Sequence, residues 1–467
     1  MAVEAYQQRR AQELGLPQGT GKLYGDPEIR AFIATPFPSE PFRADNIGVE
    51  QRQTLVDTAN GDFNQAIKLA KGLADKTAAF TLVDISIAQA KVGLEPAVSA
   101  SDILSLADQW QNNTHYQLNA QRLQVKGALL LMATGDVSQA LVTAKHVFND
   151  AMNYSDLIRV AHESNLGARP VKHLGYLSGN SAVEDTLNLA YSHFGDLRYN
   201  TAPDGIAGFA LNQRLLLGLP VEEALVDEWA KVYGKGITSN WRHLDIAAKY
   251  AKAGFPDRAE EIWKETSDEP GQPKRARVLS EIAIAWAEQD HDPLYAVDET
   301  VKLLDGYNYN GNRHHFHKGE VLANLAIAEH KIGGDSTFYI EKAIAEAAKE
   351  PSNLRSGVLL SIAEAQDKYL GIDPSETLKQ ALDWADEIFT ADPDYCRDNS
   401  YGVDTMTYED ISEGFAKAKM FTGSRIALDT IDLYKDGEGQ LDDMAMDNKI
   451  SGLTSLAEME AKASLID

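Results

Sequence analysis

A chain of 467 residues with a formal net charge of −26 is too long for one ordinary hydrophobic core, so it requires several globular domains or an elongated repeat architecture. A polyanion of this kind is repelled by phosphate backbones and anionic lipid headgroups, which argues against nucleic-acid and membrane-surface partners. Alanine, leucine, glutamate and lysine are plentiful and long stretches lack strand-type alternation, so the composition predicts an all-α protein.

The sequence shows no sign of export or of membrane insertion. It contains no run of about 18 apolar residues, and its start, MAVEAYQQRRAQELG, lacks the apolar core of a signal sequence. Cys396 is the single cysteine, which excludes an intrachain disulfide and a four-cysteine metal cluster. We therefore expect a soluble, cytoplasmic protein.

The first 48 residues are expected to form a short helix followed by an irregular arm. Residues 15–48 carry five prolines and five glycines without sustained periodicity, which is typical of a segment that docks on the body or contacts a partner. Gly15 to Lys22 differs from a phosphate-binding loop, because the glycine spacing is one residue too long and Leu23 stands where Ser or Thr is required. No nucleotide site is expected in this arm.

Internal repetition is the main feature of the sequence from about residue 49 onward. Three segments align without gaps: RARVLSEIAIA (275–285), KGEVLANLAIA (318–328) and RSGVLLSIAEA (355–365). Each begins with a basic and a small residue, continues with Val-Leu, and then has Ile or Leu followed by alanine. The apolar positions recur at helical spacing, and the alanines on that face allow a neighbouring helix to approach closely.

A second helix is predicted after each of these segments, beginning near Asp292, Asp335 and Asp373. An aspartate at the start of a helix accepts hydrogen bonds from free amides of the first turn, and a proline one position later loses no useful donor. Each unit is therefore predicted to be a helical hairpin. Weaker copies of the turn occur at residues 61–70, 135–144, 254–263 and 422–431.

The pattern divides the chain into three parts: an arm at 1–48, hairpin repeats at 49–435 and an acidic C-terminal cap at 436–467. Residues 370–467 hold 22 Asp and Glu against 8 Lys and Arg. The Gly-Asp turns followed by alanine make the body resemble the tetratricopeptide-like family of helical-hairpin repeats. This resemblance implies an α-solenoid, a right-handed superhelix of stacked hairpins, and the family's general habit of binding proteins or peptides.

A histidine cluster precedes one repeat helix and raises the question of a metal site. His317 and Glu320 are three residues apart and can face the same way, with His314 as a third ligand. No second cluster at a defined spacing supports the set, so a polar surface or a pH-sensitive contact is the plainer interpretation. We expect no bound cofactor here.

An acidic loop near the C-terminus partly matches a calcium-binding loop. Residues 432–443, DLYKDGEGQLDD, place acids at loop positions 1, 5, 7 and 12 and glycine at 6. Tyr434 occupies position 3, however, and Asp443 replaces the bidentate glutamate. A solvated acidic face is the plainer interpretation.

The connectors between hairpins are rich in Tyr, Asn, Trp, Arg and His, which are residue types favoured at recognition surfaces. The alternative is that they turn the chain and pack one repeat on the next. Six connector residues are the candidate partner-binding positions: Trp241, Tyr307, Tyr309, Arg313, His314 and Tyr395.

The leading functional hypothesis is a non-catalytic adaptor or scaffold that binds a protein or peptide partner. The sequence carries no motif that argues for catalysis. One alternative is an all-helical toroid enzyme acting on a saccharide or lipid, with Trp241, Trp286 or Trp384 and carboxylates around a central pocket. Another is a structural subunit of a larger assembly. The sequence does not fix the oligomeric state.

Overall fold

The computed structural model describes most of the chain from residue 49 to residue 465. The described residues are 49–73, 75–111, 116–148, 151–167, 182–183, 185–190, 205–234, 240–266, 272–305, 317–349, 352–391, 403–431, 434–435, 440–441 and 443–465. Within them the regular structure is helical, apart from one short antiparallel pair, β1 (Tyr434–Lys435) with β2 (Gln440–Leu441). The prediction of an all-helical protein is thus confirmed for this part, with that one exception. The arm at 1–48 lies outside it.

The chain forms two compact units, one of which is discontinuous in sequence. Unit 1 comprises residues 1–193 and 378–467, and unit 2 comprises residues 194–377. None of the described helices combines the length and the apolarity that crossing a bilayer requires.

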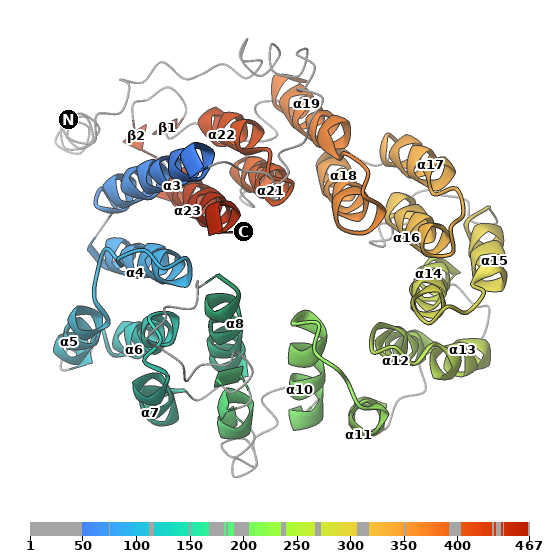
Figure 1. Ribbon diagram of the computed structural model, residues 1–467, viewed down its shortest axis with the longest axis horizontal. Helices are drawn as coiled ribbons and strands as arrows, with labels where there is room; N and C mark the ends of the chain where they lie inside the picture. Colours follow the sequence, from blue (N-terminus) through green and yellow to red (C-terminus); the bar gives the residue numbers. More distant parts are fainter. Residues whose placement is uncertain are drawn as a thin grey trace. The chain divides into compact units, whose positions relative to one another are not determined.

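Unit 2 is built from successive helical hairpins (Figure 1). Its helices are α10 (Gly205–Leu216), α11 (Glu223–Tyr233), α12 (Asn240–Lys252), α13 (Pro256–Glu265), α14 (Gln272–Glu288), α15 (Leu294–Asp305), α16 (Lys318–Lys331), α17 (Thr337–Ala347), α18 (Ser352–Ala365) and the π-helical turn η2 (Gln366–Leu370). The first helices of neighbouring hairpins, α12, α14, α16 and α18, pack side by side, and α13, α15 and α17 form a second layer. The predicted repeat segments supply three of these first helices.

The second position of each aligned repeat segment is a small residue, which explains how closely the first helices pack. Ala276 and Ser356 are buried, and Gly319 occupies the same position in α16. A Cβ atom added at Gly319 would lie only 2.6 Å from Cγ1 of Val358 in α18 and 3.1 Å from the Ala343 carbonyl in α17. The small residue is therefore a steric requirement of the stack.

Most first helices end in the same turn. At the end of α12, Gly254 has a φ of +84°, and the Phe255 amide donates to the Tyr250 carbonyl at 2.9 Å. The same five-residue spacing between donor and acceptor recurs at the ends of α14 and α16, where Asp290 and Gly333 have positive φ. A left-handed residue of this kind closes a helix by satisfying its last carbonyl groups.

The predicted aspartate caps are present after these turns. The carboxylates of Asp292, Asp335 and Asp373 accept hydrogen bonds at 2.9, 3.0 and 2.9 Å from the amides two residues later. These bonds satisfy amides that have no partner within the helix, so the aspartates fix where each second helix begins.

Unit 1 brings the first and last described helices together (Figure 1). Its helices are α3 (Val49–Ala70), α4 (Asp75–Lys91), α5 (Ala100–Gln111), α6 (Gln117–Ala133), α7 (Val137–Val147), α8 (Ala151–Gly167), most of α19 (Ser375–Ala391), α21 (Val403–Lys417), α22 (Phe421–Thr430) and α23 (Asp443–Leu465). Helix α23 packs along α3 and also contacts α4, α21 and α22. The segment predicted as an acidic cap thus contributes a helix to the core of unit 1.

Candidate functional site

The connector residues predicted to bind a partner fall almost entirely outside the described residues. This is the case for Tyr307, Tyr309, Arg313, His314 and Tyr395. Trp241 lies in the first turn of α12, but its side chain is also outside the described part. The connector surface therefore stays a prediction.

The two predicted cation sites are described only in part. His317 precedes α16 and Glu320 lies in its first turn, whereas His314 is outside the described residues. The loop at 432–443 contributes β1, β2 and the first residue of α23, and its other residues are not described. Among the described side chains, no group of three His, Cys, Asp or Glu is arranged to hold a metal ion.

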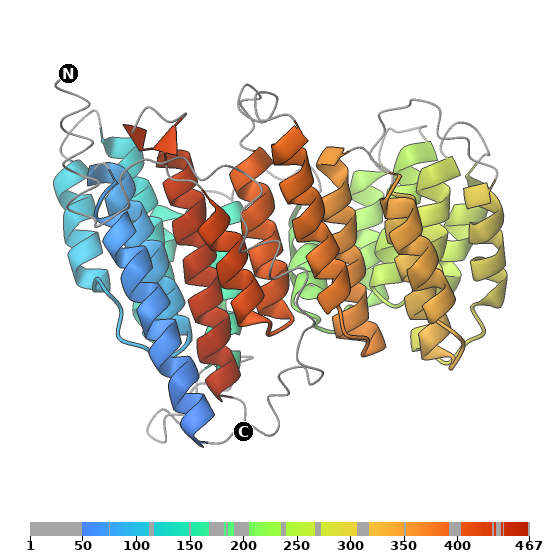
Figure 2. The same cartoon turned by 90° about the horizontal axis from the view of Figure 1, so that it is seen from above.

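The described residues present a different surface, which is formed by the turns inside the hairpins of unit 2. We call it the turn edge and define it as residues 217–228, 250–258, 286–298 and 329–342. Figure 2 shows the turns from α14 to α15 and from α16 to α17 at the same edge of unit 2.

Direct contacts join successive turns of this edge. The Gln289 side chain at the end of α14 donates to the Gly254 carbonyl in the preceding turn. Trp286 donates its indole N–H to Oδ1 of Asp257 at 3.0 Å, and its ring is largely buried. Lys331 at the end of α16 pairs with Glu288 at 3.2 Å. Neighbouring turns therefore form one continuous surface.

An open cavity of about 520 Å³ lies at the turn edge, between α11, α12 and α13. Tyr250 donates its hydroxyl proton to Asp227, and burial together with this bond raises the pKa of Tyr250 to about 12. Arg258 on the rim pairs with Glu261 at 2.6 Å. The lining offers a carboxylate, a protonated phenol and a guanidinium, which suit recognition of a polar group.

An exposed aromatic side chain lies at the start of α15 and another at the start of α17. Tyr295 and Phe338 each stand three residues after a capping aspartate, and each is 51% exposed. Nζ of Lys264 lies 5.7 Å from the centre of the Tyr295 ring, and Nζ of Lys342 lies 4.8 Å from that of Phe338. Exposed rings at one repeated position provide a large area that a partner can cover.

Carboxylates neighbour these rings along the chain, with Asp292 and Asp298 three residues to either side of Tyr295 and Asp335 three residues before Phe338. Glu329, at the end of α16, has a pKa above its ordinary value because of burial and the charges of Asp298, Asp292 and Asp335. Burial and the charges of Glu329 and Asp298 likewise raise the pKa of Tyr339, which is next to Phe338. Glu329 on α16 therefore lies within electrostatic range of Asp298 on α15 and of the two aspartate caps.

Sequence reasoning found the capping aspartates of this surface but missed Tyr295 and Phe338. Different residue types occupy this position in different repeats, so the aligned repeats do not single it out. The signal that was available is an aromatic residue at the same offset from the cap in consecutive hairpins, DPLY at 292–295 and DSTF at 335–338.

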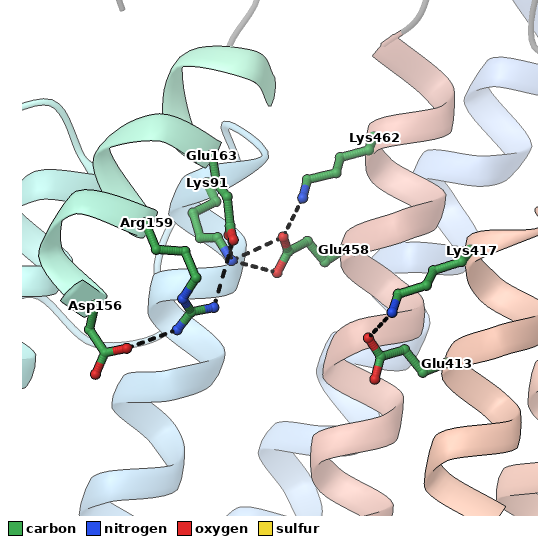
Figure 3. A network of polar contacts seen from close by, with 8 residues as sticks. All are labelled: Lys91, Asp156, Arg159, Glu163, Glu413, Lys417, Glu458 and Lys462. Atoms are coloured by element: carbon green, nitrogen blue, oxygen red, sulfur yellow. Dashed lines mark hydrogen bonds and ion pairs between the residues drawn. The ribbon is translucent and has the colours of Figure 1, made fainter. Parts of the chain in front are cut away.

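Unit 1 contains a second cluster of charged side chains, which ties α23 to α4 and α8 (Figure 3). Nζ of Lys91, which is 7% exposed, lies 3.0 Å from each carboxylate oxygen of Glu458 and also contacts Glu163. Burial would raise the pKa of Glu163, but the charge and hydrogen bond of Lys91, together with the charges of Arg159 and Lys462, outweigh burial and lower it. Lys462 contacts Glu458 at 2.6 Å.

This cluster is best explained as a structural tie. Each carboxylate in it is held by at least one cation, and removal of Lys91 would leave two largely buried carboxylates competing for the remaining cations. Removing one member of a buried ion pair costs about 3–5 kcal/mol.

Comparisons with models of protein families and with curated proteins found no match for this chain.

Proposed function

We propose that this chain is a non-catalytic helical-repeat adaptor or scaffold that binds a protein partner through the turn edge of unit 2. The observation that carries the proposal is the equal exposure of Tyr295 and Phe338 at one repeated position of adjacent hairpins. Aromatic side chains lose little conformational entropy on binding and contribute much of the free energy at interfaces, so such positions favour a partner.

The packing of unit 2 supports an α-solenoid of the tetratricopeptide-like type. Helix α14 contacts α12 and α16 as well as its own second helix α15, and α16 repeats this relation with α14, α18 and α17. Contacts between neighbouring repeats are the defining feature of such proteins. We propose a cytoplasmic location for this adaptor, as expected from its composition.

The proposal is tested by partner capture from the native cell with the full chain. We expect the double variant Tyr295→Ala/Phe338→Ala to lose at least about 10-fold in captured partner, because two aromatic anchors are removed from the interface. The control is Val142→Ala, which truncates a comparably exposed apolar residue of α7 in unit 1. Equal capture by wild type and the double variant, with helical circular dichroism unchanged, would exclude the turn edge.

The connector residues are proposed as a second contact and are tested separately. The triple variant Tyr307→Ala/Tyr309→Ala/Arg313→Ala is expected to weaken capture while leaving helical circular dichroism intact. Unchanged capture would remove the connectors from the proposal without affecting the turn edge.

One observation favours the alternative of a toroid enzyme. Helices α3 and α23, the first and last described, pack against each other within unit 1, whereas a linear stack keeps its first and last members apart. The carboxylates of Glu163 and Glu458 near this junction both contact Lys91, and the lowered pKa of Glu163 makes that group unsuited to act as a general acid. Release of reducing sugar from neutral polysaccharides or of fatty acid from phospholipid vesicles by the purified full chain would favour the enzyme.

A further inference from the structure

The part of the turn edge between α15 and α17 combines apolar and acidic side chains. Four apolar side chains are exposed there: Leu294 at 47%, Tyr295 at 51%, Ile332 at 39% and Phe338 at 51%. Apolar surface is normally kept from water, and a patch of such residues rimmed by polar groups is a common property of protein interfaces.

The carboxylates around this patch carry unbalanced charge. The four carboxylates are those of Asp292, Asp298, Glu329 and Asp335, and none of them forms an ion pair with a residue that the structure describes. Asp292 and Asp335 accept hydrogen bonds from backbone amides only. The carboxylates of Asp298 and Glu329 form neither a hydrogen bond nor an ion pair with the described residues. Their mutual repulsion contributes to the raised pKa of Glu329. A partner that brings positive charge relieves this repulsion.

The cations nearest to the patch do not neutralise these carboxylates. Lys331 pairs with Glu288, and Lys264 pairs with Glu260 at 2.7 Å. Nζ of Lys342 lies over the Phe338 ring, which meets the Tyr339 ring edge to face at 5.3 Å. The patch therefore keeps a negative rim and an apolar centre.

These features select one kind of occupant. Lysine and arginine place a cation against carboxylates while their aliphatic stems, or apolar neighbours, cover aromatic rings. A metal ion does not fit, since no described group of three ligands is arranged to hold one. A second copy of this chain, with its net charge of −26, is repelled by an acidic surface.

We infer that the turn edge between α15 and α17 binds a basic segment of a partner protein, in which lysine or arginine alternates with apolar residues. This inference rests on the proposed function and specifies the chemistry of the partner.

The test uses the full chain and a fluorescein-labelled synthetic peptide in which arginine and leucine alternate over about 12 residues, enough to span two neighbouring hairpins. One control peptide replaces arginine with glutamate, and another replaces leucine with serine. Fluorescence anisotropy at low and high ionic strength gives the Kd of each. We expect the arginine–leucine peptide to bind at least about 10-fold more tightly than either control and to weaken with salt.

Two variants assign this binding to the turn edge. Asp298→Asn/Glu329→Gln is expected to raise the Kd about 10-fold by removing two rim charges, and Tyr295→Ser/Phe338→Ser about 10-fold by removing the rings. The matched control is Glu95→Gln, which neutralises an exposed carboxylate in the turn after α4 and is expected to change the Kd less than about 2-fold. An unchanged Kd in both double variants would show general attraction to an acidic protein and overturn the inference.

Capture of the native partner separates this inference from the proposed function. If Tyr295→Ala/Phe338→Ala abolishes capture but Asp298→Asn/Glu329→Gln does not, the turn edge binds a partner that is not basic, and only the inference fails. If neither double variant affects capture, the proposed function fails as well. Loss of capture in both supports the two together.

Discussion

Glu460 shows at the scale of one residue how burial competes with ion pairing. Its side chain is 1% exposed and contacts Arg425, whose guanidinium also lies 2.9 Å from Oδ2 of Asp62. Burial raises the pKa of Glu460 to about 7; the charge and hydrogen bond of Arg425 oppose this shift, and Asp62 adds to it. The three residues join α3, α22 and α23.

The raised pKa predicts how stability depends on pH. Because Glu460 binds its proton more tightly in the folded state, its contribution to stability is fully present below its ordinary pKa of 4.5 and is lost as the pH rises to about 7. We expect the free energy of unfolding of Glu460→Gln, relative to that of the wild type, to increase by about 1–3 kcal/mol as the pH rises from 4.5 to about 7. Denaturant unfolding of the full chain at several pH values measures the gain, and a difference independent of pH would contradict the assignment.

The aspartate caps could be predicted from the sequence, whereas the exposed aromatic positions could not. Asp292 and Asp335 were predictable, because a cap acts on amides of its own helix turn and leaves a local signature. Tyr295 and Phe338 fulfil no local requirement, so no propensity distinguishes them from other exposed positions. Their common environment exists only after two hairpins have stacked.

At the scale of helices, the small residue at the start of each first helix sets the distance to the next. A methyl group at Gly319 would collide with Val358 and the Ala343 carbonyl, whereas a Cβ atom at Gly357 would meet nothing within 4 Å. Gly319 lies in the first turn of α16, and Gly357 lies in the second turn of its neighbour α18.

This contrast predicts opposite effects of one substitution. Gly319→Ala is expected to lower the free energy of unfolding of unit 2 by about 1–3 kcal/mol, through overpacking. Gly357→Ala is expected to raise it by about 0.5–1 kcal/mol, because alanine is the better helix former where space is free. Thermal unfolding followed by circular dichroism measures both, and equal shifts in the same direction would contradict the close approach of α16 and α18.

The pairing of helices was predictable within a hairpin but not between distant segments. Residues 275–365 carry their period in sequence, so the alternation of first and second helices in unit 2 followed from it. The contact of α3 with α23 has no such periodic signal: Lys91 and Glu458 are 367 positions apart and belong to segments that share no aligned motif. Complementary charge identifies a pair only once the fold has brought its members together.

At the scale of the whole molecule, the two units have different features. Unit 1 joins segments from both parts of the sequence through buried charges and the contact of α3 with α23. Unit 2 is one continuous stretch of hairpins whose turn edge leaves rings and unpaired carboxylates exposed. The buried charges and helix contacts of unit 1 stabilise the fold, and we propose that the exposed turn edge of unit 2 binds the partner.

The central claim is that a partner lies directly on the turn edge, and site-specific photo-crosslinking in the native cell tests this most directly. A photoreactive phenylalanine analogue is placed at Phe338 and, in a separate chain, at Val142 as the control. We expect position 338 to crosslink to one partner, through a peptide containing lysine or arginine, and position 142 not to crosslink to it. Crosslinks of that partner at position 142 but not at 338 would contradict this claim.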